Sequence, residues 1–209
     1  MSYAVKEIFP TLQGEGMQAG RRAVFLRFAG CNLWSGREAD RESAVCSFCD
    51  TDFIGTDGEN GGRYEAAALA ARAGDLWGPD RAQAYIVCTG GEPLLQLDAP
   101  LIDALHGEGF EIAVESNGTI AAPDGIDWLC VSPKSGSEVV QRSGDELKLV
   151  WPQEDIDPRA LRGWDFDHFL IQPMDCEQAE AVRAAAIDYV RAHPEWRLTL
   201  QTHKLLGIP

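Results

Sequence analysis

Apolar and polar positions alternate along the chain and divide it into strand-like and helix-like segments. Short runs rich in Val, Ile, Leu and aromatic residues predict strands, and longer runs with one apolar face predict helices. The predicted strands are 23–29, 84–89, 110–115, 127–131, 146–151, 167–172 and 196–201, and the predicted helices are 64–77, 98–108 and 175–192. Residues 30–62 are polar and Gly-rich, and a loop of this length is usually functional or disordered.

Strands that alternate with helices predict right-handed βαβ units and a parallel sheet. About six parallel strands are too few for a closed eight-stranded barrel, so we expect an α/β fold built as a truncated, partly open (β/α) barrel. The length of 209 residues fits a single domain, which we expect to span residues 1–209 and to carry the long loop 30–62.

Polar or Gly-rich residues follow the carboxyl ends of the predicted strands. In barrels of this kind the chemistry takes place at that edge of the sheet, so we expect these residues to converge on one site. They are Cys31 and the segments 89–92, 115–118, 132–134 and 172–175.

The formal net charge is −15, from 18 Lys and Arg against 33 Asp and Glu. Such an acidic surface repels nucleic acid and anionic lipid, but a few cations in a pocket would still bind a small anionic substrate. Neither a secretory signal nor an apolar run of membrane-spanning length is visible, so we expect a cytoplasmic protein without nucleic-acid or membrane partners. Six cysteines in that compartment are more often thiols, metal ligands or core residues than disulfides.

Three of the cysteines lie within residues 30–62. Cys46 and Cys49 are separated by two residues, a spacing that lets two thiolates bind one metal centre, and Cys31 follows the preceding strand. Three thiolates on a [4Fe–4S] cluster leave one iron open for the amino and carboxylate groups of S-adenosylmethionine. One electron then yields a 5′-deoxyadenosyl radical, so the cofactor supplies the hard chemistry and the protein orients it.

The spacing alone leaves two other interpretations open. A structural zinc site needs four ligands, and residues 30–62 hold no His and no fourth Cys, although Cys88, Cys130 and Cys176 lie elsewhere. Cys88 and Cys130 fall inside predicted core strands, where free Cys usually packs. The third interpretation is a redox dithiol formed by Cys46 and Cys49.

The segment after the strand 84–89 favours the cluster. Gly90 and Gly91 let the backbone approach a ligand closely, and Glu92 is an acceptor for an ammonium group such as that of S-adenosylmethionine. The competing interpretation is a plain strand-to-helix turn at Pro93. Because three cysteines accompany this segment, we prefer the ligand-binding interpretation.

Together these motifs resemble radical S-adenosylmethionine enzymes, and more narrowly the 7-carboxy-7-deazaguanine synthase family of queuosine biosynthesis. The resemblance runs through residues 11–16, 27–33, 46–51, 89–93, 115–118, 132–134, 172–173 and 201–204. The superfamily usually places three residues between its first two cysteines, whereas fourteen separate Cys31 from Cys46 here. A subset of this synthase family has the long spacing, which sharpens the match.

This family converts 6-carboxy-5,6,7,8-tetrahydropterin to 7-carboxy-7-deazaguanine with ring contraction and loss of ammonia, so the resemblance implies a carbon–nitrogen lyase. It implies that the adenosyl radical abstracts a hydrogen from the substrate and later takes one back, so that S-adenosylmethionine acts catalytically. It also implies Mg²⁺ as a cofactor, an external electron donor of the flavodoxin-like kind and a homodimer.

The resemblance further implies roles for single residues. The expected catalytic residues are the cluster ligands Cys31, Cys46 and Cys49, and Thr51 is the expected Mg²⁺ ligand. The expected substrate contacts are Leu12, Gln13, Gly14, Glu15, Arg27, Thr89 and Pro209. The expected S-adenosylmethionine contacts are Phe48, Cys49, Asp50, Gly91, Glu92, Ser132, Pro133, Lys134, Gln172, Pro173, Met174 and Asp175. Glu115, Asn117 and His203 are weaker candidates.

Two rival functions stay open. One is another radical S-adenosylmethionine enzyme, such as a glycyl-radical activase, which would have to dock a large protein. Arg27 argues against it, because a guanidinium between Leu26 and Phe28 suits the carboxylate of a small substrate. The other rival is a zinc-binding module without catalytic activity, which iron and zinc analysis would distinguish.

Overall fold

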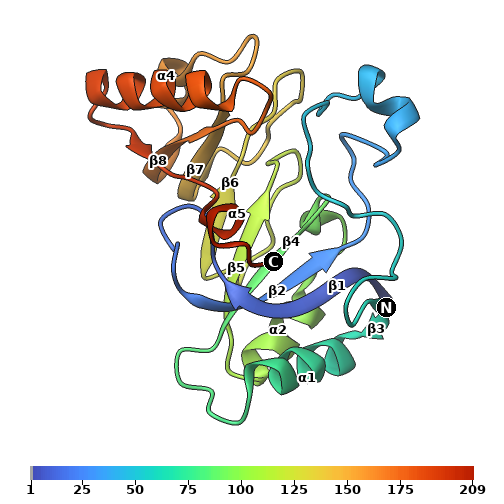
Figure 1. The fold of residues 1–209 in the computed structure, drawn as a ribbon. Coiled ribbons are helices and arrows are strands. Elements are labelled where there is room, and N and C mark those ends of the chain that lie inside the picture. The colour runs from blue at the N-terminus through green and yellow to red at the C-terminus, as the bar shows by residue number, and fades with distance from the viewer. Residues whose placement is uncertain (1) are drawn as a thin grey trace.

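A computed structural model describes residues 2–209, in which nine strands form one sheet in the order β3-β1-β2-β4-β5-β6-β7-β8-β9 (Figure 1). The strands are β1 (Ser2–Leu12), β2 (Arg22–Phe28), β3 (Gly62–Glu65), β4 (Tyr85–Gly90), β5 (Glu111–Ser116), β6 (Trp128–Val131), β7 (Ser143–Trp151), β8 (Asp165–Pro173) and β9 (Arg197–Leu198). The α-helices are α1 (Ala66–Trp77), α2 (Ala99–Gly107), α3 (Pro158–Leu161), α4 (Ala179–Ala192) and α5 (Thr202–Leu206), and the 3₁₀ helices are η1 (Glu38–Ser43) and η2 (Pro93–Leu95).

Most of the sheet is parallel, but it does not close. Every neighbouring pair in the order from β2 to β9 is parallel, whereas β1 is antiparallel to β2 and β3 is antiparallel to β1. The order ends at β3 on one edge and at β9 on the other. The structure therefore confirms the α/β fold expected from the sequence, a partly open barrel with fewer than eight parallel strands.

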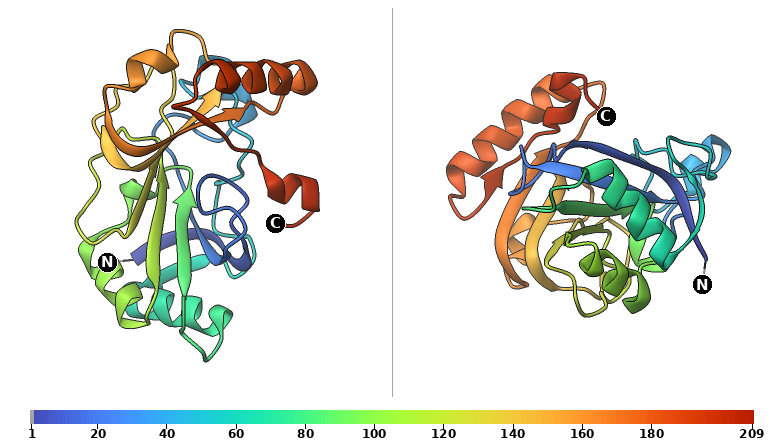
Figure 2. Two further views of the ribbon diagram at one scale, coloured as in Figure 1. Left: turned by 90° about the vertical axis from the view of Figure 1, so that its left-hand side faces the viewer. Right: turned by 90° about the horizontal axis from the view of Figure 1, so that it is seen from below.

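The helices cover the sheet in two groups. Helix α1 packs against α2, β1 and β2, and α4 packs against β8 and β9. Figures 1 and 2 show these two groups at opposite ends of the molecule, with the C-terminal segment between them. None of the helices between residues 2 and 209 combines the length and apolar composition needed to cross a membrane.

The parallel strands supply a core of branched apolar side chains. Val87 of β4, Ile112 of β5, Leu149 of β7 and Ile171 of β8 are all fully buried. Burial of each such side chain stabilises the fold by about 1.5–3 kcal/mol relative to leaving it exposed. The runs of apolar residues that predict these strands are those of strands buried on both faces, and this is why their prediction succeeds.

The strand β1 is not predicted by the hydrophobic pattern. Lys6 and Glu7 interrupt its alternation, and the register with β2 shifts between Val5 and Glu7, as at a β-bulge. Both polar side chains line the cavity described below. The strand continues past them to Leu12.

Several elements differ from the predicted boundaries. The helix predicted over 175–192 begins only at Ala179, and the strand predicted over 146–151 begins at Ser143. The segment Gly62–Glu65 pairs with β1 as strand β3, so the helix predicted from residue 64 begins at Ala66. The strand predicted over 196–201 is only Arg197–Leu198 long. It ends there because the chain turns toward the site, where the Thr199 hydroxyl accepts the N–H of Gly16 at 2.8 Å.

Candidate active site

The carboxyl ends of the strands surround one cavity of about 400 Å³. Its walls come from residues 12–15, the loop 30–62, the segments that follow β4, β5, β6 and β8, and the C-terminal residues beyond β9. The convergence of strand ends predicted from the sequence is therefore present.

Most of the residues expected in the site line this cavity. They are Leu12, Gln13, Gly14, Glu15, Arg27, Cys31, Cys46, Phe48, Cys49, Asp50, Thr51, Thr89, Gly91, Ser132, Lys134, Gln172, Pro173, Met174, Asp175 and Pro209. The weaker candidates Glu115, Asn117 and His203 line it as well. Glu92 and Pro133 are buried and are not among the lining residues.

Charged side chains of both signs are concentrated at the cavity. All four lysines of the chain, Lys6, Lys134, Lys148 and Lys204, line it, and so does Arg27. The chain as a whole carries a formal net charge of −15. Six carboxylates line the cavity too, those of Glu7, Glu15, Asp50, Asp52, Glu115 and Asp175, and four of the five cations form ion pairs with them. A small anion would therefore be bound by single groups that keep free donors and not by a general positive field.

Three free thiols face the cavity together. The Cys46 thiol donates a hydrogen bond to the sulfur of Cys49, which lowers the pKa of Cys49 to about 6 and raises the pKa of Cys46. Burial raises the pKa of Cys31, although its sulfur accepts the N–H of Leu33 at 3.4 Å. The hydrogen bond from Cys46 therefore favours the thiolate form of Cys49, the form in which cysteine binds metal.

The three thiols fit a cluster with three protein ligands. Cys31 comes from the end of β2 and the other two from the long loop, and a charge on one of the three sulfurs shifts the pKa of another. Within residues 2–209, no three His, Cys, Asp or Glu side chains converge closely enough to hold a single metal ion. Cysteine thiolates are nevertheless the ligands of a four-iron cluster, and three of them leave one of its irons free.

A lysine lies beside these sulfurs. The Lys134 ammonium donates to the Ser132 carbonyl at 2.8 Å and to the Ser132 hydroxyl at 2.7 Å. Burial lowers the pKa of Lys134, and the nearby Cys46 and Cys49 raise it. A cation in this position favours the thiolate form of both cysteines and suits a ligand carboxylate.

Gly90 and Gly91 let the end of β4 approach the chain around Cys31. A Cβ on Gly91 would lie 2.2 Å from the carbonyl oxygen of Gly30 and 2.7 Å from the Cβ of Cys31. Gly90 has a φ of +144°, and a Cβ there would lie 2.3 Å from the carbonyl oxygen of Phe28. The contact therefore requires glycine at both positions.

Glu92 does not occupy the place expected for an acceptor of a ligand's ammonium group. Its side chain is fully buried, and its Oε1 accepts the Leu94 N–H and the Ser116 hydroxyl, both at 2.9 Å. Its Oε2 accepts the Asn117 N–H at 2.7 Å. Burial raises the pKa of this carboxyl. The carboxylate instead fastens η2 to the end of β5, as the interpretation of this segment as a strand-to-helix turn requires.

Arg27 keeps donors available for a ligand. Its Nε donates to Glu7 at 2.8 Å, and no hydrogen bond from residues 2–209 engages its two Nη groups. Thr89 is its register partner on β4, and both residues line the cavity. Two parallel N–H groups of a guanidinium match the two oxygens of a carboxylate.

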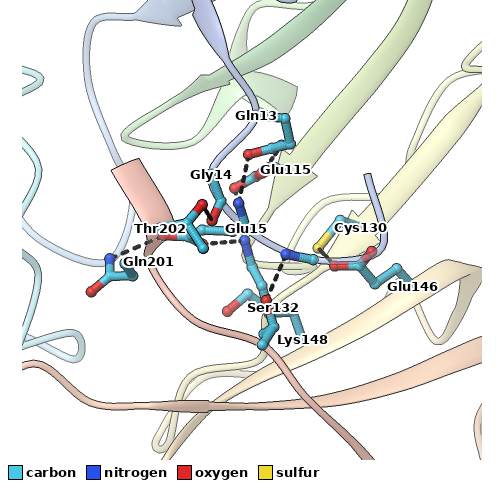
Figure 3. Close-up of polar contacts among 12 residues, drawn as sticks. Gln13, Gly14, Glu15, Glu115, Cys130, Ser132, Glu146, Lys148, Gln201 and Thr202 are labelled. Carbon is cyan, nitrogen blue, oxygen red and sulfur yellow. Dashed lines mark hydrogen bonds and ion pairs between the residues drawn. The ribbon is translucent and has the colours of Figure 1, made fainter. Parts of the chain in front are cut away.

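A buried ion-pair network joins the N-terminal loop to the sheet. The Lys148 ammonium contacts Glu15 Oε2 at 2.5 Å and Glu115 Oε2 at 3.0 Å (Figure 3). Gln201 donates to Glu15 Oε1 at 3.0 Å, and Gln13 donates to Glu115 Oε1 at 2.8 Å. The five side chains come from four separate parts of the sequence, and all of them line the cavity.

The C-terminal residues tie three walls of the cavity together. The backbone N–H and the hydroxyl of Thr202 donate to the Gly14 carbonyl at 2.9 Å and 2.8 Å. The Lys204 ammonium contacts Asp50 of the long loop at 2.6 Å and Asp175 after β8 at 2.7 Å. The tail is therefore part of the site, as the resemblance of residues 201–204 leads us to expect.

Several lining residues are missed by sequence reasoning, above all Lys6, Glu7 and Lys148. For Lys148 a weak signal exists, because Glu146 and Lys148 alternate with apolar residues and so share one face of a strand. For Lys6 no local signal exists, because the bulge that turns it toward the cavity leaves no mark in the sequence.

Known proteins similar to the chain agree in name. It is 63% identical over 209 residues to the 7-carboxy-7-deazaguanine synthase of Bradyrhizobium diazoefficiens, with 100% of both chains covered. It is 60% identical over 212 residues to the synthase of the same name from Caulobacter vibrioides, again with 100% of both covered. The crystal structure of QueE from Escherichia coli superposes with a TM-score of 0.72 at 27% identity, covering 96% of this chain and 94% of that one. No protein-family model matches the chain.

Proposed function

The chain belongs to the 7-carboxy-7-deazaguanine synthase family, and we infer that it is a radical S-adenosylmethionine lyase that converts 6-carboxy-5,6,7,8-tetrahydropterin to 7-carboxy-7-deazaguanine, a step of queuosine biosynthesis. The observation that carries this inference is the match over the full length of named synthases, together with three thiols that share one cavity with the chain's lysines.

The cluster belongs on Cys31, Cys46 and Cys49. When bound, the [4Fe–4S] cluster and S-adenosylmethionine supply the 5′-deoxyadenosyl radical that takes a hydrogen from the substrate. Gly91 lets the backbone come close to this cofactor, and the Lys134 ammonium offsets the negative charge of the thiolates. Further contacts to S-adenosylmethionine come from Phe48, Asp50, Ser132 and the segment 172–175. Glu92 and Pro133 are buried behind the lining residues and support the cavity wall.

The substrate carboxylate belongs at Arg27. The Nη groups of Arg27 form a bidentate pair with that carboxylate, and Thr89 beside it adds a hydroxyl. The amine-bearing edge of the pterin meets acceptors on Gln13 and Glu15 at the N-terminal loop. Pro209 of the tail contributes a further contact to the substrate.

The size of the site suits a small substrate. A cavity of about 400 Å³ lies within the usual range for small-molecule sites. The Lys204 bridge between Asp50 and Asp175 ties the tail across it. An activase would need an open surface for a large partner, and family membership speaks against a zinc-binding module.

Several finer points complete the proposal. Thr51 binds Mg²⁺ together with the substrate carboxylate. The protein acts as a homodimer in the cytoplasm and receives electrons from an external, flavodoxin-like donor. Residues 1–209 work as one domain, with residues 30–62 as the cluster-binding loop.

Turnover under anaerobic conditions tests the function. The reconstituted protein is incubated with S-adenosylmethionine, a reductant and the tetrahydropterin, and the deazaguanine product and ammonia are measured by mass spectrometry and an ammonia assay. We expect C176A to form as much deazaguanine and as much ammonia as the wild type, because Cys176 does not line the cavity. We expect neither from C49A.

Two outcomes would contradict the proposal. One is a wild-type protein that binds four irons yet releases no deazaguanine from the pterin, which would leave the substrate wrong. The other is a colourless protein that holds one zinc ion after anaerobic purification, which would favour the zinc-binding module.

A further inference from the structure

Lys148 is one of the most deeply buried charges of the molecule. Only 4% of its side chain is exposed, on a strand whose neighbouring residues Leu147 and Leu149 are fully buried. Removing an ammonium from water is costly unless anions compensate for it. Glu15 and Glu115 provide that compensation, at 2.5 Å and 3.0 Å from its nitrogen.

The two carboxylates are held in matching ways. Each gives one oxygen to Lys148 and the other to a side-chain amide, Gln201 for Glu15 and Gln13 for Glu115. An ionised carboxylate has about four lone-pair sites, so each keeps acceptor capacity. Since both glutamates line the cavity, that capacity is available to a ligand.

Other charged groups around the network do not replace Lys148. Glu146 and Cys130 interact with it from β7 and β6, and both are acidic groups. Lys134 interacts electrostatically with Lys148, but its own hydrogen bonds go to Ser132, and His203 on the tail lies near Glu15. Burial raises the pKa of Glu15, but the Lys148 ammonium, with smaller contributions from Gln201 and His203, outweighs it, so the net pKa lies below the usual value.

We propose that Lys148 is a positioning residue for the pterin, which holds the carboxylates of Glu15 and Glu115 as a fixed, ionised pair of acceptors for the ring's N–H groups. This rests on the proposed function, and it deepens that function by assigning recognition of the ring to one shared cation. Arg27 binds the substrate's carboxylate, and the pair fixed by Lys148 binds the amine-bearing edge.

Loss of the cation has a specific consequence. In K148M two buried carboxylates face each other without a counter-ion, so one of them takes up a proton at a higher pH than before. A protonated carboxyl presents a donor where the ring needs an acceptor. Pterin affinity should therefore fall by about tenfold for each pH unit below the raised pKa.

Equilibrium binding tests the proposal without turnover. Anaerobic calorimetry measures the affinity of the tetrahydropterin for the reconstituted holoenzyme with S-adenosylmethionine and no reductant, from pH 6 to 8.5. We expect a flat profile for the wild type and for K148R, which keeps the cation. We expect a steep loss of affinity toward low pH for K148M.

Two further variants separate positioning from folding. E154Q changes an exposed acidic residue that does not line the cavity, and we expect it to keep the flat profile. If K148M fails to fold, E115Q and K148M/E115Q form a matched pair in which only the cation differs. We then expect pH dependence in the double variant alone.

The outcomes distinguish a failure of the proposed function from a failure of the role assigned to Lys148. A wild-type holoenzyme that does not bind the pterin contradicts the proposed function itself. A wild type that binds, with K148M equally weakened at every pH or not weakened at all, overturns only the role assigned to Lys148.

Discussion

The buried carboxylate of Glu92 gives the sharpest test of how the site is built. Its side chain is fully buried and accepts three hydrogen bonds, from Leu94, Ser116 and Asn117. Replacement by glutamine keeps the shape of the side chain but exchanges one oxygen for an NH₂ group. That amide can still accept from Leu94 and Ser116, but it meets the Asn117 N–H with a second donor.

The magnitude follows from these contacts. A lost hydrogen bond to a charged group costs about 1.5–3 kcal/mol. Burial raises the pKa of Glu92, so removal of the charge offsets part of that cost. We expect E92Q to lose about 2 kcal/mol of unfolding free energy, because one buried donor is left unpaired. For a chain of this size that lowers Tm by about 4–8 °C.

The pH dependence has a definite sign. Because burial raises the pKa of Glu92 in the folded chain, the folded state binds its proton more tightly than the unfolded state. The resulting stability is complete below the unfolded pKa and is lost as pH rises through the folded pKa. E92Q has no titratable group at this position. As the pH rises from the unfolded-state pKa of Glu92 to its folded-state pKa, the free energy of unfolding of the wild type should therefore exceed that of E92Q by a smaller amount.

The assay is thermal unfolding of the reconstituted protein, followed by circular dichroism from pH 4 to 8. E154Q is the matched control, because Glu154 is exposed and the same substitution there should leave Tm unchanged. If E92Q melts with the control and binds S-adenosylmethionine more weakly, the carboxylate contacts the ligand after all, and the structural role assigned to it is wrong.

Three further predictions concern the cavity walls. G91A should lose most of its iron on reconstitution, because the new Cβ would lie 2.2 Å from the Gly30 carbonyl oxygen and displace Cys31. The control G107A has open space around its Cβ and should keep its iron. Equal iron content in both variants would refute the close approach. R27M should raise the KM for the pterin by about 30-fold or more, as expected for loss of one partner of a buried charge pair. In R27K the KM should rise by a smaller factor. An unchanged KM of R27M in steady-state assays would exclude Arg27 as the carboxylate site. K204M should change stability by less than about 1 kcal/mol, because its ion pairs are half-exposed, yet raise the KM by loosening the tail; a loss of stability without a change in KM would make the bridge purely structural.

The parts of the fold that follow from local pattern are predictable from the sequence. The parallel strands β4, β5 and β8 are buried on both faces, so their apolar runs stand out. Helices α1 and α2 each bury one apolar face, whereas α4 buries only Ala186. The strand β1 escapes because it carries Lys6 and Glu7 at a bulge, and β3 escapes because four residues at an edge carry little signal.

Some residues of the site can likewise be predicted from the sequence, and others cannot. The cysteines and glycines can be found in the sequence because Cys31, the Cys46–Cys49 pair and the Gly90–Gly91 pair occur together, although each motif alone has other interpretations. Lys148 is only weakly signalled, since a lysine in a strand usually faces solvent and this one is buried by its pairing with Glu15 and Glu115 from other parts of the chain. Burial of Glu92 is likewise set by tertiary packing between β4 and β5.

The central claim is that three thiolates hold a [4Fe–4S] cluster whose fourth iron is open to S-adenosylmethionine. The most direct measurement is electron paramagnetic resonance of the reduced, reconstituted protein with and without S-adenosylmethionine. The account predicts a [4Fe–4S]⁺ signal in the wild type that changes when the ligand is added, and no such signal in C31A, C46A or C49A. A wild-type signal that the ligand leaves unchanged, or an equally intense signal in any of these three variants, would contradict it.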